Sequence, residues 1–151
     1  MLNFQRKCGL LKEAYLHAAE FSPDLSTQNA AILIGRDGHV ILKSVNKFPA
    51  GVQQTPERWE RPLKYAYVEH AERNLIYTAA WAGVSTYGKI MICPWFACAD
   101  CARAIVVAGI EEVIGNIVTG KQVNIPVPMC SAMWGRRRLA QPTVGYVGSS
   151  L

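Results

Sequence analysis

The chain has 151 residues, half of them hydrophobic and 18% charged, and its formal net charge of +5 favours an anionic partner, either a phosphorylated small molecule or nucleic acid. This length can close one hydrophobic core and is short for two, so we expect a single domain over residues 1–151. No apolar run approaches the roughly 18 residues of a membrane span, and residues 1–7 lack the apolar stretch of a signal peptide, so we expect a soluble, cytoplasmic protein with no membrane partner.

The first half of the chain predicts a helix followed by a β-hairpin. Apolar residues recur at helical spacing over 2–20, and Pro23 then interrupts the pattern. Two apolar, β-branched runs, 30–34 and 40–45, flank a Gly-Arg-Asp-Gly turn and predict two antiparallel strands. Residues 46–68 carry three prolines and no periodic pattern, which predicts a long loop with at most one helical turn.

The second half predicts alternating helices and strands. Residues 70–82 keep an apolar stripe at helical spacing up to a glycine, where a helix would stop. Residues 89–93 predict a strand, 98–108 an apolar helix and 112–118 another strand. Strand, helix and strand at this spacing imply a parallel crossover. A last strand is expected at 143–147.

Cysteine and histidine positions predict a metal site. The five cysteines are an odd number that a reducing cytosol keeps as thiols, which favours metal or redox chemistry over disulfides. A catalytic zinc ion takes three protein ligands and leaves its fourth position for water, and His70, Cys98 and Cys101 supply such a set for Zn²⁺. The two cysteines open a helix whose N-terminus favours thiolates. Glu72, two residues after His70, is placed to move protons.

Neither half of this motif is specific alone. A Cys-x-x-Cys pair can be a redox pair or half of a structural zinc site, and a His-x-Glu tripeptide arises by chance on helices. Cys93 could also join His70, Cys98 and Cys101 in a closed structural site without an open position. The specific feature is the order: His-x-Glu opens one helix, a strand follows, and Cys-x-x-Cys opens the next helix.

The chain resembles the cytidine and deoxycytidylate deaminase superfamily, whose signature pairs His-x-Glu with Pro-Cys-x-x-Cys. The similarity covers about residues 22–118 and is strongest to the deoxycytidylate deaminase branch. It is carried by the segments 22–28, 46–51, 69–74 and 98–105. Ala97 stands where the family usually has proline, so we expect the loop that cradles the base to differ.

The resemblance implies a three-layer α/β/α fold with a mixed sheet of about five strands. It also implies hydrolytic deamination of dCMP to dUMP and ammonia, in which zinc-bound hydroxide attacks C4 of the base and Glu72 protonates N3 and the departing ammonia. By the same resemblance, Asn46 bonds the sugar hydroxyl and the backbone amide of Ala71 bonds the pyrimidine carbonyl. A homo-oligomer is expected.

Two other functions stay open. The positive charge would suit a base deaminase of tRNA or single-stranded DNA, but the sequence lacks an aromatic and basic platform, so we expect a small nucleotide as partner and no nucleic acid. A closed site with Cys93 would instead make a non-catalytic, zinc-stabilised binding domain. Trp95 is a candidate wall of the pocket. Candidates for phosphate contacts are Arg61, Lys64 and Arg73, whereas the basic run at 136–138 is typical of a solvated surface.

Overall fold

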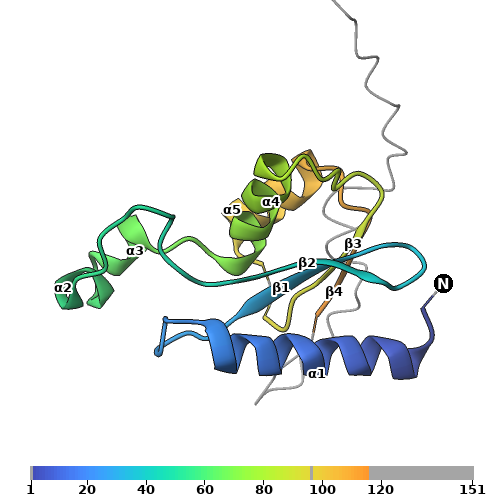
Figure 1. Ribbon diagram of the computed structural model, residues 1–151, viewed down its shortest axis with the longest axis horizontal. Coiled ribbons are helices and arrows are strands. Elements are labelled where there is room, and N and C mark those ends of the chain that lie inside the picture. The colour runs from blue at the N-terminus through green and yellow to red at the C-terminus, as the bar shows by residue number, and fades with distance from the viewer. Residues whose placement is uncertain (1, 96, 116–151) are drawn as a thin grey trace, which may run out of the picture.

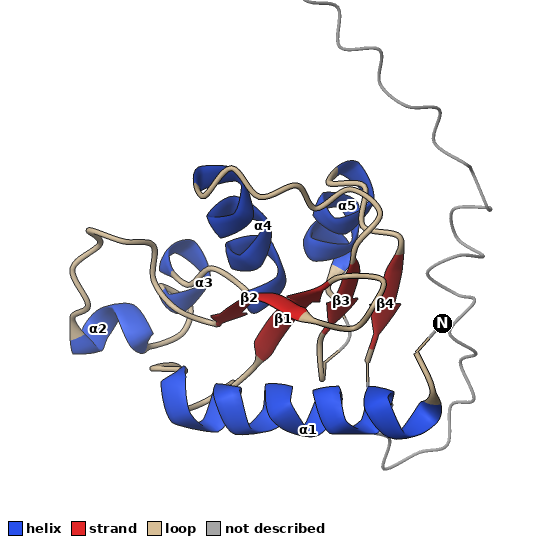
Figure 2. Ribbon diagram, turned by 45° about the vertical axis from the view of Figure 1, so that its right-hand side comes forward, coloured by secondary structure: helices blue, strands red, loops and turns tan. Residues whose placement is uncertain are grey.

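A mixed sheet lies between two layers of helices in the computed structural model, which describes residues 2–95 and 97–115 (Figure 1 and Figure 2). The strands are β1 (Ala30–Ile34), β2 (Val40–Val45), β3 (Ile90–Ile92) and β4 (Glu112–Ile114), in the order β2-β1-β3-β4. Helix α1 (Phe4–Phe21) covers one face, and α4 (Ala71–Trp81) and α5 (Ala99–Val107) cover the other.

The predicted three-layer α/β/α fold is therefore confirmed, but the sheet has four strands over the described residues rather than about five. The strand expected at 143–147 lies outside the described residues. Residues 116–151 also lie outside the described residues, so a single domain over residues 1–151 stays a prediction.

The N-terminal helix confirms the prediction for residues 2–20. It begins at Asn3, whose side-chain oxygen accepts a hydrogen bond of 2.8 Å from the backbone N–H of Arg6 and so caps the first turn. It buries Leu10, Ala14 and Ala18 against the sheet. Within the described part of the chain, no helix combines the length and apolar character that crossing a bilayer would need.

The β1–β2 hairpin forms over the predicted residues, and β1 is buried on both faces because helices cover both sides of the sheet. Its alternating side chains divide between two cores. Ala30, Ile32 and Ile34 face α1, whereas Ala31 and Leu33 pack with α4 and α5. This double burial explains why the strand is a continuous apolar run.

Residues 46–68 contain two short helices, where the sequence predicts at most one helical turn. Helix α2 (Pro56–Trp59) begins with proline, whose missing N–H is not needed at that position. The ring of Trp59, its last residue, stacks on buried Phe48. Helix α3 (Lys64–Tyr67) buries Lys64. Both helices depend on contacts with distant residues, which a local pattern does not reveal.

The sheet topology brings several chain segments to one edge. Strand β2 is antiparallel to β1, and β1 is antiparallel to β3, so the start of β1 lies beside the ends of β2 and β3. Strand β4 is parallel to β3, which confirms the predicted crossover through α5. Residues that leave β2 and β3, and those that enter β1, therefore meet at this edge, where α4 also begins.

Candidate active site

Three side chains that the sequence predicts as metal ligands come together at this edge. His70 precedes the first residue of α4, Cys98 precedes the first residue of α5, and Cys101 lies in the first turn of α5. Their ligand atoms all lie within 4.8 Å of one another. The convergence of the two helix starts, which the order of elements only implied, is thus present in the fold.

The distances within this group fit a zinc ion. Nδ1 of His70 lies 3.5 Å from Sγ of Cys98 and 3.5 Å from Sγ of Cys101. Tetrahedral zinc, with Zn–S of about 2.3 Å and Zn–N of about 2.0 Å, would separate nitrogen and sulfur by about 3.5 Å. One imidazole and two sulfurs form a donor set that zinc prefers, so the three residues could hold Zn²⁺ and leave a fourth position for water.

The two cysteines differ in burial. Cys101 is fully buried, and burial together with the nearby charge of Glu72 raises the pKa of its thiol. A bound cation acts in the opposite direction, because it stabilises the thiolate. The N-terminus of α5 also favours negative charge at both sulfurs. A bound cation and the N-terminus of α5 would therefore together favour the thiolate form of both cysteines.

Glu72 lies in the first turn of α4 and is only 2% exposed. Burial raises the pKa of its carboxyl group, so this group takes up a proton more readily than a solvated glutamate. Its Oε2 atom has no hydrogen-bond partner among the described residues. A buried carboxylate with an unoccupied oxygen can accept and release protons within the site.

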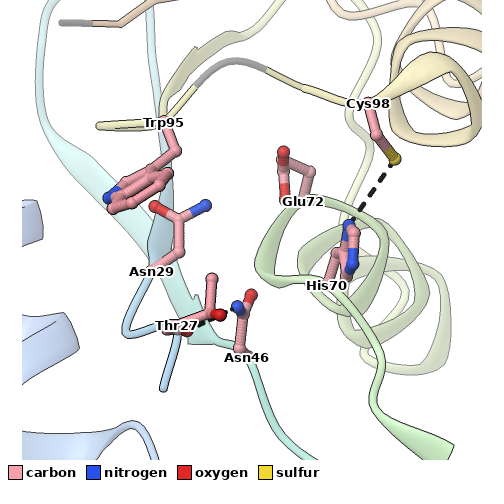
Figure 3. Close-up of a pocket in the computed structure, with 7 residues that line it drawn as sticks. All are labelled: Thr27, Asn29, Asn46, His70, Glu72, Trp95 and Cys98. Carbon is pink, nitrogen blue, oxygen red and sulfur yellow. Dashed lines mark hydrogen bonds between the residues drawn. The ribbon is translucent and has the colours of Figure 1, made fainter. Parts of the chain in front are cut away.

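Glu72 shares one cavity of about 130 Å³ with two members of the metal-binding group, His70 and Cys98. Figure 3 shows Glu72, His70 and Cys98 on one side of it. The other side is formed by Thr27, Asn29, Asn46 and Trp95. Trp95 thus lines the cavity as the sequence predicts, with 54% of its surface exposed.

The two predicted substrate-binding residues contact each other. The backbone N–H of Ala71 donates a hydrogen bond of 2.8 Å to Oδ1 of Asn46, and Nδ2 of Asn46 donates one of 2.8 Å to the carbonyl oxygen of Thr27. Asn46 keeps a second lone pair and a second N–H for a ligand, whereas the single N–H of Ala71 already has a partner.

Cys93 lies outside the metal-binding group, although the sequence left a four-ligand site open. Its thiol is buried, donates to the carbonyl oxygen of Trp95 at 3.1 Å and accepts from Nδ2 of Asn29 at 3.4 Å. Among the described residues, the group that could hold a metal contains His70, Cys98 and Cys101. The structure thus favours an open three-ligand arrangement.

The phosphate candidates are largely engaged within the protein. Lys64 is 5% exposed, and its Nζ donates hydrogen bonds to Oδ1 of Asp24 at 2.6 Å and to Oγ of Ser26 at 2.5 Å. Arg73 donates to Glu69 at 2.5 Å. The sequence interpretation of Lys64 as a phosphate contact is therefore wrong: its ammonium group fixes the loop before β1.

We expect Lys64→Met to lower the free energy of unfolding by about 3 kcal/mol, because the Asp24 carboxylate would stay buried without its cation. Chemical denaturation measures this loss. The double variant Lys64→Met/Asp24→Asn should recover much of it, since no buried charge then remains unpaired. As a control, Arg36→Met removes the exposed ion pair between Arg36 and Glu111 and should change the free energy of unfolding little. A Lys64→Met variant as stable as wild type would contradict the interpretation.

Sequence reasoning missed two residues of the cavity wall, Thr27 and Asn29. Both precede β1, in a segment without periodic pattern. Thr27 lies in segment 22–28, which carries part of the family resemblance, and the signal for Asn29 was a polar Gln28-Asn29 pair directly before a fully apolar strand. That pattern does not distinguish a cavity residue from an ordinary loop residue, because only the pairing of β1 with β2 and β3 places it beside α4.

The sequence is similar to that of known deaminases. The family model described as "Cytidine and deoxycytidylate deaminase zinc-binding region" matches residues 5–116. The deoxycytidylate deaminase of Mus musculus is 34% identical over 103 residues, which are 64% of this chain and 57% of that protein. The human deoxycytidylate deaminase is 32% identical over the same shares. The chain thus spans little more than half the length of these relatives.

The fold is also similar to that of a solved deaminase. The dCMP deaminase of cyanophage S-TIM5, solved in complex with dCMP and dUMP, superposes with a TM-score of 0.63 at 24% identity, covering 75% of this chain and 82% of that chain. This similarity shows a shared fold. Since the family model covers most of the 151 residues, including all three metal-binding side chains, the chain belongs to the cytidine and deoxycytidylate deaminase zinc-binding family.

Proposed function

We propose that this chain is a zinc-dependent hydrolase that converts dCMP to dUMP and ammonia. One observation carries the proposal: a group fit to hold zinc borders the cavity through His70 and Cys98, and a buried glutamate with an unpartnered oxygen lines the same cavity. A structural zinc site needs no such carboxylate and no cavity beside it. Hydrolysis at a metal needs the carboxylate as a proton acceptor and the cavity as room for the substrate.

His70, Cys98 and Cys101 would hold the ion. Zinc bound there would act as a Lewis acid and make water a nucleophile near neutral pH. Glu72 would take one proton from the attacking water and deliver it to N3 of the pyrimidine, and would then carry a second proton from the new C4 hydroxyl to the departing ammonia. Burial suits this role, because it raises the pKa of Glu72 and so lets the side chain hold a transferred proton more readily.

Asn46 would bond the sugar hydroxyl with the lone pair and N–H that its internal hydrogen bonds leave over. Its contacts with Ala71 and Thr27 would fix its orientation before the ligand arrives. The amide of Ala71 could bond the pyrimidine carbonyl only by sharing its hydrogen or by releasing Asn46. This substrate contact therefore requires a rearrangement at the start of α4.

The choice of dCMP is supported by the relatives. Deoxycytidylate deaminases of mouse and human are similar in sequence, and a structure with the same fold was solved with dCMP and dUMP. The positive net charge suits a phosphorylated ligand. Lys64 is buried against Asp24, which leaves Arg61 and Arg73 of the three phosphate candidates.

Ammonia release by the zinc-loaded chain tests the proposal. The substrates to compare are cytidine, CMP, dCMP, dCTP and single-stranded DNA. We expect the highest kcat/KM with dCMP and little ammonia from single-stranded DNA. A zinc-bound, folded protein that releases no ammonia from any nucleotide would refute deamination of free nucleotides, and activity on single-stranded DNA alone would favour the nucleic-acid reading. Size-exclusion chromatography would test the predicted homo-oligomer.

A further inference from the structure

The carboxamide of Asn29 has one polar atom with a partner and one without. Asn29 is 5% exposed and precedes the first residue of β1, where its backbone carbonyl accepts a hydrogen bond of 3.1 Å from the N–H of Asn46. Its Nδ2 donates to Sγ of Cys93, but Oδ1 has no hydrogen-bond partner among the described residues. Leaving a buried amide oxygen unpaired destabilises the folded chain, so its retention calls for a reason.

The contacts of Cys93 decide which atom of the carboxamide is unpaired. The Cys93 thiol donates its hydrogen to the carbonyl oxygen of Trp95 at 3.1 Å, so its sulfur can only accept from Asn29. The atom that faces the sulfur must therefore be the N–H₂ group. The oxygen is the unpaired atom, and what it lacks is a hydrogen-bond donor.

The unpaired oxygen belongs to a residue that lines the cavity. Four buried side-chain oxygens lack partners in the described part of the chain, and two of them belong to residues that line the cavity, Glu72 and Asn29. Glu72 has its role in proton transfer. The remaining cavity amide, that of Asn46, is held by Ala71 and Thr27. Figure 3 shows Asn29 between Trp95 and Thr27, across the cavity from the metal-binding residues.

We propose that Asn29 is a ligand-contacting residue whose Oδ1 accepts a hydrogen bond from an N–H or O–H donor of the bound nucleotide. This inference rests on the proposed function, because the donor belongs to a deoxycytidine nucleotide. That ligand carries two suitable donors, the 4-amino group of the base and the 3′-hydroxyl of the sugar. The contact adds selectivity, since a ligand without the donor leaves the oxygen unpaired.

Titration calorimetry with dCMP tests the contact in a Glu72→Gln background, which should bind the nucleotide without consuming it. Asn29→Leu removes the acceptor and keeps the side-chain size. We expect it to raise the Kd for dCMP about tenfold, the value of one net hydrogen bond. Without ligand its melting temperature should change little, because removal of the unpaired oxygen offsets loss of the long hydrogen bond from Nδ2 to Cys93.

Ser44→Ala is the matched control. Ser44 is also buried and its Oγ also lacks a partner, but it does not line the cavity. Its Kd for dCMP should equal that of the Glu72→Gln parent. If both variants weaken binding equally, the effect of Asn29→Leu is a general consequence of core substitution and the proposal fails.

Two analogues identify the donor. With dUMP, whose 4-carbonyl cannot donate, the difference in Kd between the parent and its Asn29→Leu variant should vanish if the amino group is the donor. With 2′,3′-dideoxycytidine monophosphate it should vanish if the 3′-hydroxyl is the donor. A difference that persists with both analogues overturns the contact, and so does equal binding of dCMP by parent and Asn29→Leu. A parent that does not bind dCMP instead overturns the proposed substrate, and the inference with it.

Discussion

Glu72→Gln is expected to lower kcat for dCMP deamination about 10²- to 10⁴-fold, the usual contribution of a positioned acid–base group. Glutamine has the same size as glutamate and keeps an acceptor oxygen, but it cannot take up a proton. Because Glu72 is buried beside the ligand group and is not itself one of its members, zinc content should stay at the wild-type value. Steady-state ammonia release and metal analysis of the same preparation measure both effects.

The control for this experiment is Glu111→Gln. Glu111 forms an exposed ion pair of 2.6 Å with Arg36 and lies outside the cavity, so kcat should be unchanged. A Glu72→Gln variant with kcat within tenfold of wild type would show that another group moves the proton. A variant that loses zinc as well would show that Glu72 supports the metal site, and the catalytic assignment would then need separate evidence.

Removing a metal-binding side chain is expected to abolish both zinc binding and activity. Cys101→Ser should lower zinc affinity at least about 100-fold. Loss of a residue that only hydrogen-bonds a metal ligand can already cost about that much, and loss of a ligand itself should cost more. The serine hydroxyl is a poor substitute because it does not ionise as a thiol does. Zinc per chain after dialysis, and competition with a chromogenic chelator, measure the change. Chelator-treated wild type should regain activity when zinc is restored.

Cys93→Ser separates the open site from the closed one. Cys93 bonds Trp95 and Asn29 and lies outside the metal-binding group, so its serine variant should keep full zinc content. Cys8→Ser on the exposed part of α1 serves as the matched control for loss of any cysteine. If Cys93→Ser loses zinc as completely as Cys101→Ser, the four-ligand structural site is correct and the catalytic proposal fails.

Local pattern predicts those parts of the fold whose stability is local. Strands 30–34 and 40–45 form as expected because a β-branched run, a glycine turn and a second run are sufficient to specify a hairpin. The helices of 46–68 were missed because their contacts are not local: Lys64 bonds Asp24, forty positions earlier. The same distance made a buried, paired lysine look like a cation available for phosphate.

The candidate donor set of the site was predicted from residue types together with their order along the chain, because zinc prefers imidazole and thiolate and proton transfer needs a group such as a carboxylate. His70, Glu72, Cys98 and Cys101 were therefore identified by order and spacing. Their geometry was not, because His70 and Cys98 approach to 3.5 Å only when α4 and α5 pack on the same face of the sheet. Tertiary structure likewise decided that Cys93 turns away from this group and that Asn29 enters the cavity.

The sequence by itself thus determined the kind of chemistry, since functional groups and their order along the chain do not depend on packing. Only the tertiary structure decided which groups act together. The cavity residues meet because β1 pairs antiparallel with β2 and β3. This pairing brings residues from four separate segments to one edge of the sheet. For Asn29 that pairing left one oxygen without a donor, a property that can be seen only when every neighbour is in place.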